Sequence, residues 1–82
     1  MQGIVTHIKH HGVIATLDGT PEIGDLFEIY RIENGEDVIL AKGYVRKEKG
    51  VGYNISVMDK EDGSRGIPWV GILVGDLVRT AT

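Results

Sequence analysis

Glycines divide this chain into short apolar segments, and this division limits how the chain can fold more than any other feature of the sequence. Of the 82 residues, 12 are glycines, which is about twice the usual share of ~7%. The segments between them are rich in Ile, Val and Tyr, residues that are enriched in strands. No window keeps the apolar period of a helix, about 3.6 residues, over a helical length. The pattern predicts an all-β protein.

A turn near residue 11 predicts the pairing of the first two strands. We interpret His11-Gly12 as a two-residue turn, because glycine supplies the positive φ that such hairpins need. This register places Ile8 opposite Ala15 and Thr6 opposite Leu17. A slip by one residue would exchange the two faces of the hairpin. The predicted inward face consists of Ile4, Thr6, Ile8, Ala15 and Leu17.

Further turn signals divide the rest of the chain into four more strands, at 26–32, 38–46, 53–58 and 69–80. Asn34-Gly35 joins the first two of these strands and is the strongest short hairpin signal known. A polar loop at 59–66 precedes the last strand. Six short strands with closely spaced turns predict one small barrel that spans residues 1–82 as a single domain.

The two halves of the chain have a similar sequence pattern, which we call the echo. Gly3-Ile4-Val5 and Gly43-Tyr44-Val45 each begin a hairpin that leads to an apolar-Gly-Asp-Leu step, and these steps contain Gly24-Asp25 and Gly75-Asp76. Glycine adopts backbone conformations that are costly for other residues, and the aspartate carboxylate accepts hydrogen bonds from nearby backbone N–H groups. We interpret the four residues of the two steps as structural turns. The echo predicts a barrel with pseudo-two-fold symmetry.

The segments around these steps resemble a known family. They are 3–5, 12–17 and 23–31 in the first half, and 43–45, 54–57 and 74–79 in the second half. Together they are similar to the C-terminal small β-barrel domain of the flagellar assembly protein T family and of related bacterial envelope modules. The resemblance implies a non-enzymatic module that helps to pack larger assemblies. The chain departs from that pattern in its polar loop and in the apolar run at 67–73.

Composition excludes several classes of protein. The chain has no cysteine, so it has neither a disulfide framework nor a Cys-based zinc site. Nine Lys and Arg residues against twelve Asp and Glu residues give a formal net charge of −3, which argues against a broad phosphate-binding face. The sequence predicts neither a signal peptide nor a membrane-spanning segment. By default we expect a cytoplasmic or virion-associated protein.

Three histidines, His7, His10 and His11, are the candidate metal ligands. On strands His7 and His10 point to opposite faces, and His7 lies about 13 Å from His11. One chain therefore cannot bring them together on an ion, although a metal held between subunits stays open as an alternative. The acidic loop at 59–64 lacks the alternating ligand spacing of a calcium loop.

Motifs for catalysis are missing from the sequence. Gly50-Val51-Gly52 is too short to cradle a phosphate, and it reads as a hairpin turn. The only serines, Ser56 and Ser64, do not lie in a nucleophile elbow. We therefore expect a protein that is not an enzyme and that binds no cofactor.

The segment at 67–77 is apolar on both of its predicted faces. A small barrel cannot bury all of these side chains, and exposed apolar patches mark interaction sites. The alternative is that the segment crosses the core of the barrel. We predict docking onto copies of the chain or onto a larger scaffold, such as an envelope ring, an extracellular filament or a virion. The predicted interface residues are Trp69, Val70, Ile72, Leu73, Phe27 and Tyr30.

A second hypothesis uses the basic hairpin at 42–53. Small barrels bind single-stranded nucleic acid through basic and aromatic side chains. The residues of this type in the hairpin are Lys42, Tyr44, Arg46, Lys47, Lys49 and Tyr53. Glu48 within the patch and the negative net charge oppose this reading.

Overall fold

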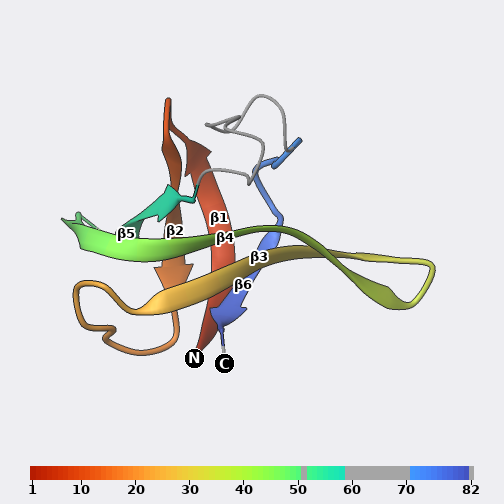
Figure 1. The fold of residues 1–82 in the computed structure, drawn as a ribbon, viewed down its shortest axis with the longest axis horizontal. Helices are drawn as coiled ribbons and strands as arrows, with labels where there is room; N and C mark the ends of the chain where they lie inside the picture. Colours follow the sequence, from red (N-terminus) through yellow and green to blue (C-terminus); the bar gives the residue numbers. More distant parts are fainter. Residues whose placement is uncertain (51, 59–70, 82) are drawn as a thin grey trace.

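Six antiparallel strands close into a barrel in the computed structural model, which describes residues 1–50, 52–58 and 71–81. The strands are β1 (Gln2–Ile8), β2 (Gly12–Leu17), β3 (Leu26–Glu33), β4 (Glu36–Lys49), β5 (Gly52–Val57) and β6 (Leu77–Thr80). Their order around the barrel is β1-β2-β5-β4-β3-β6 (Figure 1). The all-β barrel predicted from the sequence is confirmed. No helix among the described residues has the length and hydropathy required to cross a membrane.

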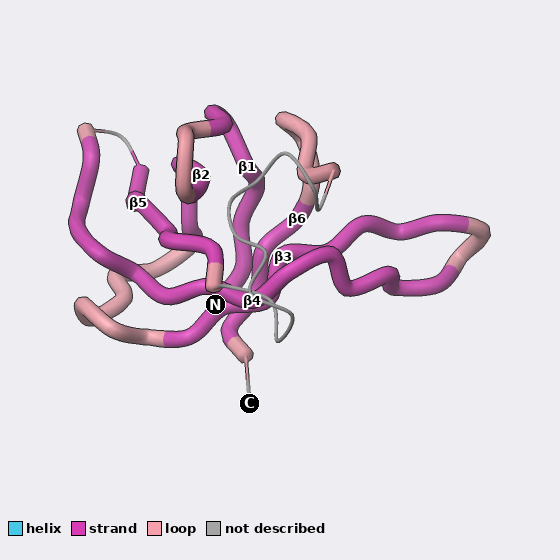
Figure 2. Tube along the Cα trace, turned by 45° about the horizontal axis from the view of Figure 1, so that its top comes forward, coloured by secondary structure: helices cyan, strands magenta, loops and turns pink. Residues whose placement is uncertain are grey.

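The hairpin of β3 and β4 projects beyond the rest of the barrel. Its far end extends away from the other strands, as Figures 1 and 2 both show. Asn34 and Gly35 form the turn with φ values of 51° and 80°, as expected for a two-residue hairpin that needs positive φ at both positions. The Asn-Gly hairpin predicted from the sequence is thus confirmed.

The predicted register of the first hairpin is wrong. Ile8 pairs with Val13 rather than Ala15, and Ile4 pairs with Thr16. The Lys9 N–H donates to the Gly12 carbonyl over 2.8 Å, so the two turn residues are His10 and His11 instead of the predicted His11 and Gly12.

A β-bulge is the reason that the inward face also differs from the prediction. The pairing of β1 and β2 shifts between Val5 and His7, and such a shift inserts one unpaired residue and changes which side chains face the core. Val5 is completely buried, whereas Ile4 and Ile8 are exposed. The core side of β1 is therefore the side that holds Val5.

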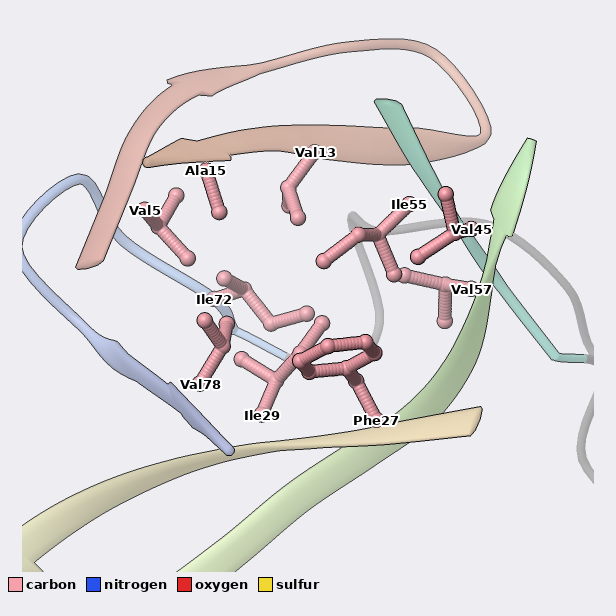
Figure 3. Close-up of a cluster of buried hydrophobic side chains, with 10 residues drawn as sticks. All are labelled: Val5, Val13, Ala15, Phe27, Ile29, Val45, Ile55, Val57, Ile72 and Val78. Carbon is pink, nitrogen blue, oxygen red and sulfur yellow. The ribbon is translucent and has the colours of Figure 1, made fainter. Parts of the chain in front are cut away.

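The core is formed by side chains from every strand. Phe27 and Ile29 of β3 belong to one buried cluster with Val5, Ile55 and Val78 of other strands (Figure 3). The complete cluster is Val5, Val13, Ala15, Phe27, Ile29, Val45, Ile55, Val57, Ile72 and Val78. Mainly β-branched side chains thus fill the interior.

The predicted pseudo-two-fold symmetry is visible in the backbone hydrogen bonds of the two Gly-Asp turns. Gly24 N–H donates to the Val45 carbonyl, and Val45 N–H donates to the Asp25 carbonyl, over 2.8 and 3.0 Å. The second turn makes the same two bonds with β1: Gly75 N–H to Val5 O at 2.9 Å, and Val5 N–H to Asp76 O at 2.8 Å. β4 also has a bulge directly after Val45, where β1 has one after Val5. Each half therefore anchors its Gly-Asp turn on the first strand of the other half.

The last strand is shorter than predicted. The sequence predicts a strand over 69–80, but β6 begins at Leu77. Residues 71–76 form the turn that leads into β6, and residues 69 and 70 lie outside the described part of the chain. Gly71 and Gly75 have positive φ values of 72° and 99°, a backbone conformation that does not continue a strand.

Candidate docking surface

The residues predicted to form the interface do not lie on one surface. Phe27 and Ile72 are only 1% and 4% exposed and belong to the core, so their assignment to a surface patch is corrected. They point inward because Phe27 alternates with outward-facing residues of β3, and because Ile72 closes the barrel from the turn before β6. Leu73 is 60% exposed. Trp69 and Val70 lie outside the described residues.

Tyr30, the remaining predicted residue, lies on the outer face of the β3–β4 hairpin. Successive residues of a strand point to opposite sides, and Phe27 and Ile29 face the core. The residues of β3 that face outward are therefore Leu26, Glu28, Tyr30 and Ile32. Their partners on β4 are Tyr44, Lys42, Ile39 and Asp37. We call these eight residues the hairpin face.

Four of the apolar residues on the hairpin face are exposed to solvent. Ile32 and Ile39, beyond the middle of the hairpin, are 56% and 44% exposed. Leu26 and Tyr44 form a directly opposed pair at the other end and are 49% and 40% exposed. An exposed set of apolar side chains on one sheet face is typical of a protein contact surface.

Arg79 of β6 holds the centre of the hairpin face together. Its guanidinium donates to Glu28 Oε2 over 3.0 Å and to Asp37 Oδ2 over 2.6 Å. Its Cζ atom lies 4.2 Å from the centroid of the Tyr30 ring, which is the geometry of a cation–π contact. The hydrogen bonds to Asp37 and Glu28 raise the pKa of Arg79 above its ordinary value. Tyr30 is therefore covered from outside by a side chain of the same molecule.

The apolar row through Tyr30 continues across the sheet. Tyr30 pairs with Ile39 on one side and with Leu77 of β6 on the other, and Leu77 pairs with Ile4 of β1. Ile4 is exposed. The hairpin face is thus connected to further apolar side chains on the outside of the barrel.

Asp76 has a role that sequence reasoning did not reveal. Its carboxylate accepts two hydrogen bonds from Arg31, both 2.8 Å long, and one from the Leu73 N–H at 2.7 Å. Arg31 also donates to the Gly71 carbonyl over 3.0 Å. Burial raises the pKa of Asp76, but the bonds from Arg31 and Leu73 outweigh this effect and hold the pKa below its ordinary value.

The equivalent carboxylate in the first half is simpler. Asp25 accepts a bond from the Glu22 N–H over 2.9 Å and is exposed. The interpretation of both Gly-Asp steps as structural turns agrees with these local bonds. Arg31 lies 45 residues before Asp76, and no local signal connects two residues at that separation.

The basic hairpin splits between the two sides of the sheet. Lys42 and Tyr44 face outward, whereas Gly43 and Val45, which alternate with them along β4, face the core. Tyr53 instead packs against the core. Arg46 lies at the bulge of β4, and Lys47 and Lys49 follow on the exposed end of the strand. The candidate nucleic-acid residues therefore do not form one surface.

Histidines and carboxylates are scattered over the described part of the chain. His10 and His11 stack edge to face in the first turn with ring centroids 4.2 Å apart, while His7 contacts the Thr6 hydroxyl. Within residues 1–50, 52–58 and 71–81, no group of three or more possible ligands could hold a metal ion. Every buried side-chain N or O atom in these ranges has a hydrogen-bond partner.

No family model matches the chain, and no curated protein matches it at a significant level.

Proposed function

We propose that this protein is a non-enzymatic assembly module that docks on another protein surface through the hairpin face. The partner is a copy of the chain or a larger scaffold of the kind found in envelope rings, filaments or virions. The observation that carries the proposal is the exposure of Leu26, Ile32, Ile39 and Tyr44 on one side of a hairpin that reaches beyond the barrel. The resemblance to packing modules of the bacterial envelope supports the same class of function.

The ionic centre of the hairpin face fits this role. Glu28 and Asp37 both pair with Arg79 within the molecule, so each of these charges keeps an opposite partner when the surface is covered, and an uncompensated buried charge would be costly. The apolar side chains around them supply the favourable burial. Tyr44 and Arg79 are of residue types that are enriched in contact surfaces.

A double substitution on the hairpin face tests the proposal. Ile32→Ser with Ile39→Ser should abolish self-association, measured by light scattering across a dilution series from about 1 mM to about 1 μM, a range that covers weak and moderate contacts. The free energy of unfolding should change by no more than about 1 kcal/mol, because both residues are on the surface. Leu73→Ser is the matched control, since Leu73 is equally exposed but lies outside the hairpin face.

Two results would contradict the docking surface. If Leu73→Ser or Trp69→Ala abolishes association while the hairpin variant associates normally, docking uses the segment before β6. If the wild-type chain scatters as a monomer at every concentration, docking onto copies of itself is excluded.

A second candidate, binding of single-stranded nucleic acid, is favoured only by Lys42 and Tyr44, which share the outer face of β4 with Lys47 close by. If it is correct, an unlabelled oligonucleotide should bind at low salt and dissociate as the salt concentration rises. Absence of binding at low salt would exclude it.

A further inference from the structure

The two halves of the barrel interlock. β3 belongs to the first half, yet both of its neighbours, β4 and β6, belong to the second half. In the same way β6 lies between β1 and β3 of the first half. Among the described strands, only the β1–β2 and β4–β5 pairs stay within one half. Neither half can therefore complete its own sheet, and each half offers its third strand to the other.

A single two-residue turn joins these halves. Glu33 and Glu36 are the last paired residues of the hairpin, and Asn34 and Gly35 connect them. A Cβ atom at Gly35 would meet nothing within 4 Å. The turn lies at the far end of the hairpin, away from the core (Figures 1 and 2). A change in its conformation therefore alters no contact inside the barrel.

We propose that two copies of this chain exchange halves, with Asn34-Gly35 as the hinge. When the turn opens, β3 and β4 become one continuous strand, and residues 1–33 of each copy pair with residues 36–82 of the other. All six strand pairs of the barrel are kept: β1–β6, β2–β5, β3–β4 and β3–β6 now form between two chains, whereas β1–β2 and β4–β5 stay within one chain. The product is a dimer of two barrels joined by a two-stranded ribbon, a common outcome when a hinge loop opens.

The position of the hinge prevents a collision between the barrels. The ribbon that joins them is built from the part of the hairpin that already extends beyond the barrel. The hairpin face stays exposed in the dimer, and the exchange does not depend on the docking function proposed above. Exchange requires opening of strand pairs in the core, whereas docking is a contact between closed barrels.

The alternation of side chains along a strand constrains the backbone conformation of the opened hinge. Glu33 and Glu36 face each other across the hairpin, so both point to the same side of the sheet. In one regular strand, however, residues three apart point to opposite sides. The exchanged wild-type ribbon therefore needs one bulged residue, and Gly35, which already has φ 80°, suits such a bulge.

Refolding the wild-type chain from denaturant tests the proposal. Refolding at about 1 mM, near the effective concentration within a flexibly linked chain, should yield a fraction with twice the monomer mass of 9.0 kDa. Refolding at about 1 μM should yield only monomer. The dimer should persist after dilution, unlike a docked pair, and Ile32→Ser with Ile39→Ser should leave its yield unchanged. A monomer alone at both concentrations would overturn the exchange.

Two cysteine pairs reveal how the chains are connected, because the native chain has no cysteine. Ile4 pairs with Leu77 of the other half and with Thr16 of its own half. In the dimer fraction, a disulfide in Ile4→Cys/Leu77→Cys should link the two chains covalently. The control Ile4→Cys/Thr16→Cys should stay within one chain. If the first pair also stays within one chain, the dimer forms by docking and the proposal is wrong.

A variant without the turn provides a second test. Deletion of Gly35 places Glu33 and Glu36 two residues apart, which gives a regular ribbon, and Asn34→Val removes the last residue that readily accepts a positive φ. We expect this variant to be a dimer even at about 1 μM, a concentration at which the wild-type chain refolds as a monomer. A folded monomer, or a chain that no longer folds, would contradict the proposal.

Discussion

Two glycines are required because backbones from the two halves approach each other closely. A Cβ atom at Gly12 would lie 2.3 Å from the Ile55 carbonyl oxygen, and one at Gly52 would lie 2.6 Å from the Ala15 carbonyl oxygen. We expect Gly12→Ala and Gly52→Ala each to lower the free energy of unfolding by about 1–3 kcal/mol, measured as a shift in the urea midpoint.

Gly19→Ala is the control for these two substitutions. The nearest atom to a Cβ at Gly19 is the end of the Met1 side chain, at 3.2 Å, which can move aside. This substitution should change the stability by less than about 0.5 kcal/mol. If all three variants lose the same stability, close approach does not explain Gly12 and Gly52, because the restriction of the unfolded chain by alanine on its own raises the free energy of unfolding.

The carboxylate of Asp76 should give the protein a stability that depends on pH. It accepts three hydrogen bonds, whereas Asp25 accepts one. At pH 7 we expect Asp76→Ala to cost about 2–3 kcal/mol and Asp25→Ala about 1 kcal/mol.

The pH range of this effect follows from the lowered pKa of Asp76. A carboxylate with a lowered folded-state pKa contributes its full stabilisation above the unfolded value, here 3.8, and loses it as the pH falls through the folded value. The difference between the wild-type chain and Asp76→Ala, from urea titrations, should thus be constant above about pH 5 and shrink below pH 4. A difference that grows on acidification would contradict the ion pair with Arg31.

Gly12 illustrates how far the structural role of a single residue can be predicted from the sequence. Glycine is typical of turns and of places where two backbones nearly touch, and the sequence cannot distinguish these uses. Gly24 and Gly75 lie in turns as predicted, whereas Gly12 begins β2 beside Ile55. The contact of Arg31 with Asp76 was beyond prediction for a related reason, because it depends on the closed barrel.

At the scale of elements, the number and order of the strands were predictable, but the bounds of the last strand and the register of the first hairpin were not. The Asn34-Gly35 hairpin follows from local turn chemistry, and its two strands form as expected. In the first hairpin a bulge after Val5 moves the core face to Val5. A bulge arises where the barrel must bend, so its position depends on strands that are distant in sequence. Alternation alone therefore identified the strand but assigned the wrong face.

The apolar segment at 67–77 shows that the sequence likewise could not predict which residues form a contact surface. An apolar run indicates burial or contact, and the sequence does not say which of its side chains takes which role. The Gly-Asp turn decides this, because it directs Ile72 into the core and leaves Leu73 exposed. The hairpin face escaped prediction because apolar residues occupy both faces of β3 and β4, as in Leu26-Phe27 and Val38-Ile39-Leu40, so the sequence does not say which of them face outward.

The whole molecule consists of two halves related by pseudo-two-fold symmetry, and its chain ends lie beside each other. Thr80 N–H donates to the Met1 carbonyl over 2.9 Å, and Figure 1 shows both termini on the same side of the barrel. The chain joins the halves at the hinge, and the nearby termini offer a second place at which they could be joined. A chain that is joined at the termini and opened at the hinge would contain the same two halves in the opposite order.

This circular permutant is expected to fold into the same barrel and to remain a monomer. The chain would start at Gly35, continue through residue 82 and a flexible linker of about six Gly and Ser residues into Met1, and end at Asn34. Opening the chain at an exposed turn is well tolerated, and the turn contributes no contact to the core, so the free energy of unfolding should fall by no more than about 1–2 kcal/mol. The permutant no longer has the hinge, and refolding it at about 1 mM should yield no persistent dimer under conditions in which the wild-type chain does. Light scattering of both chains refolded in parallel measures the difference, and an equal dimer yield would show that the turn is not where the halves separate.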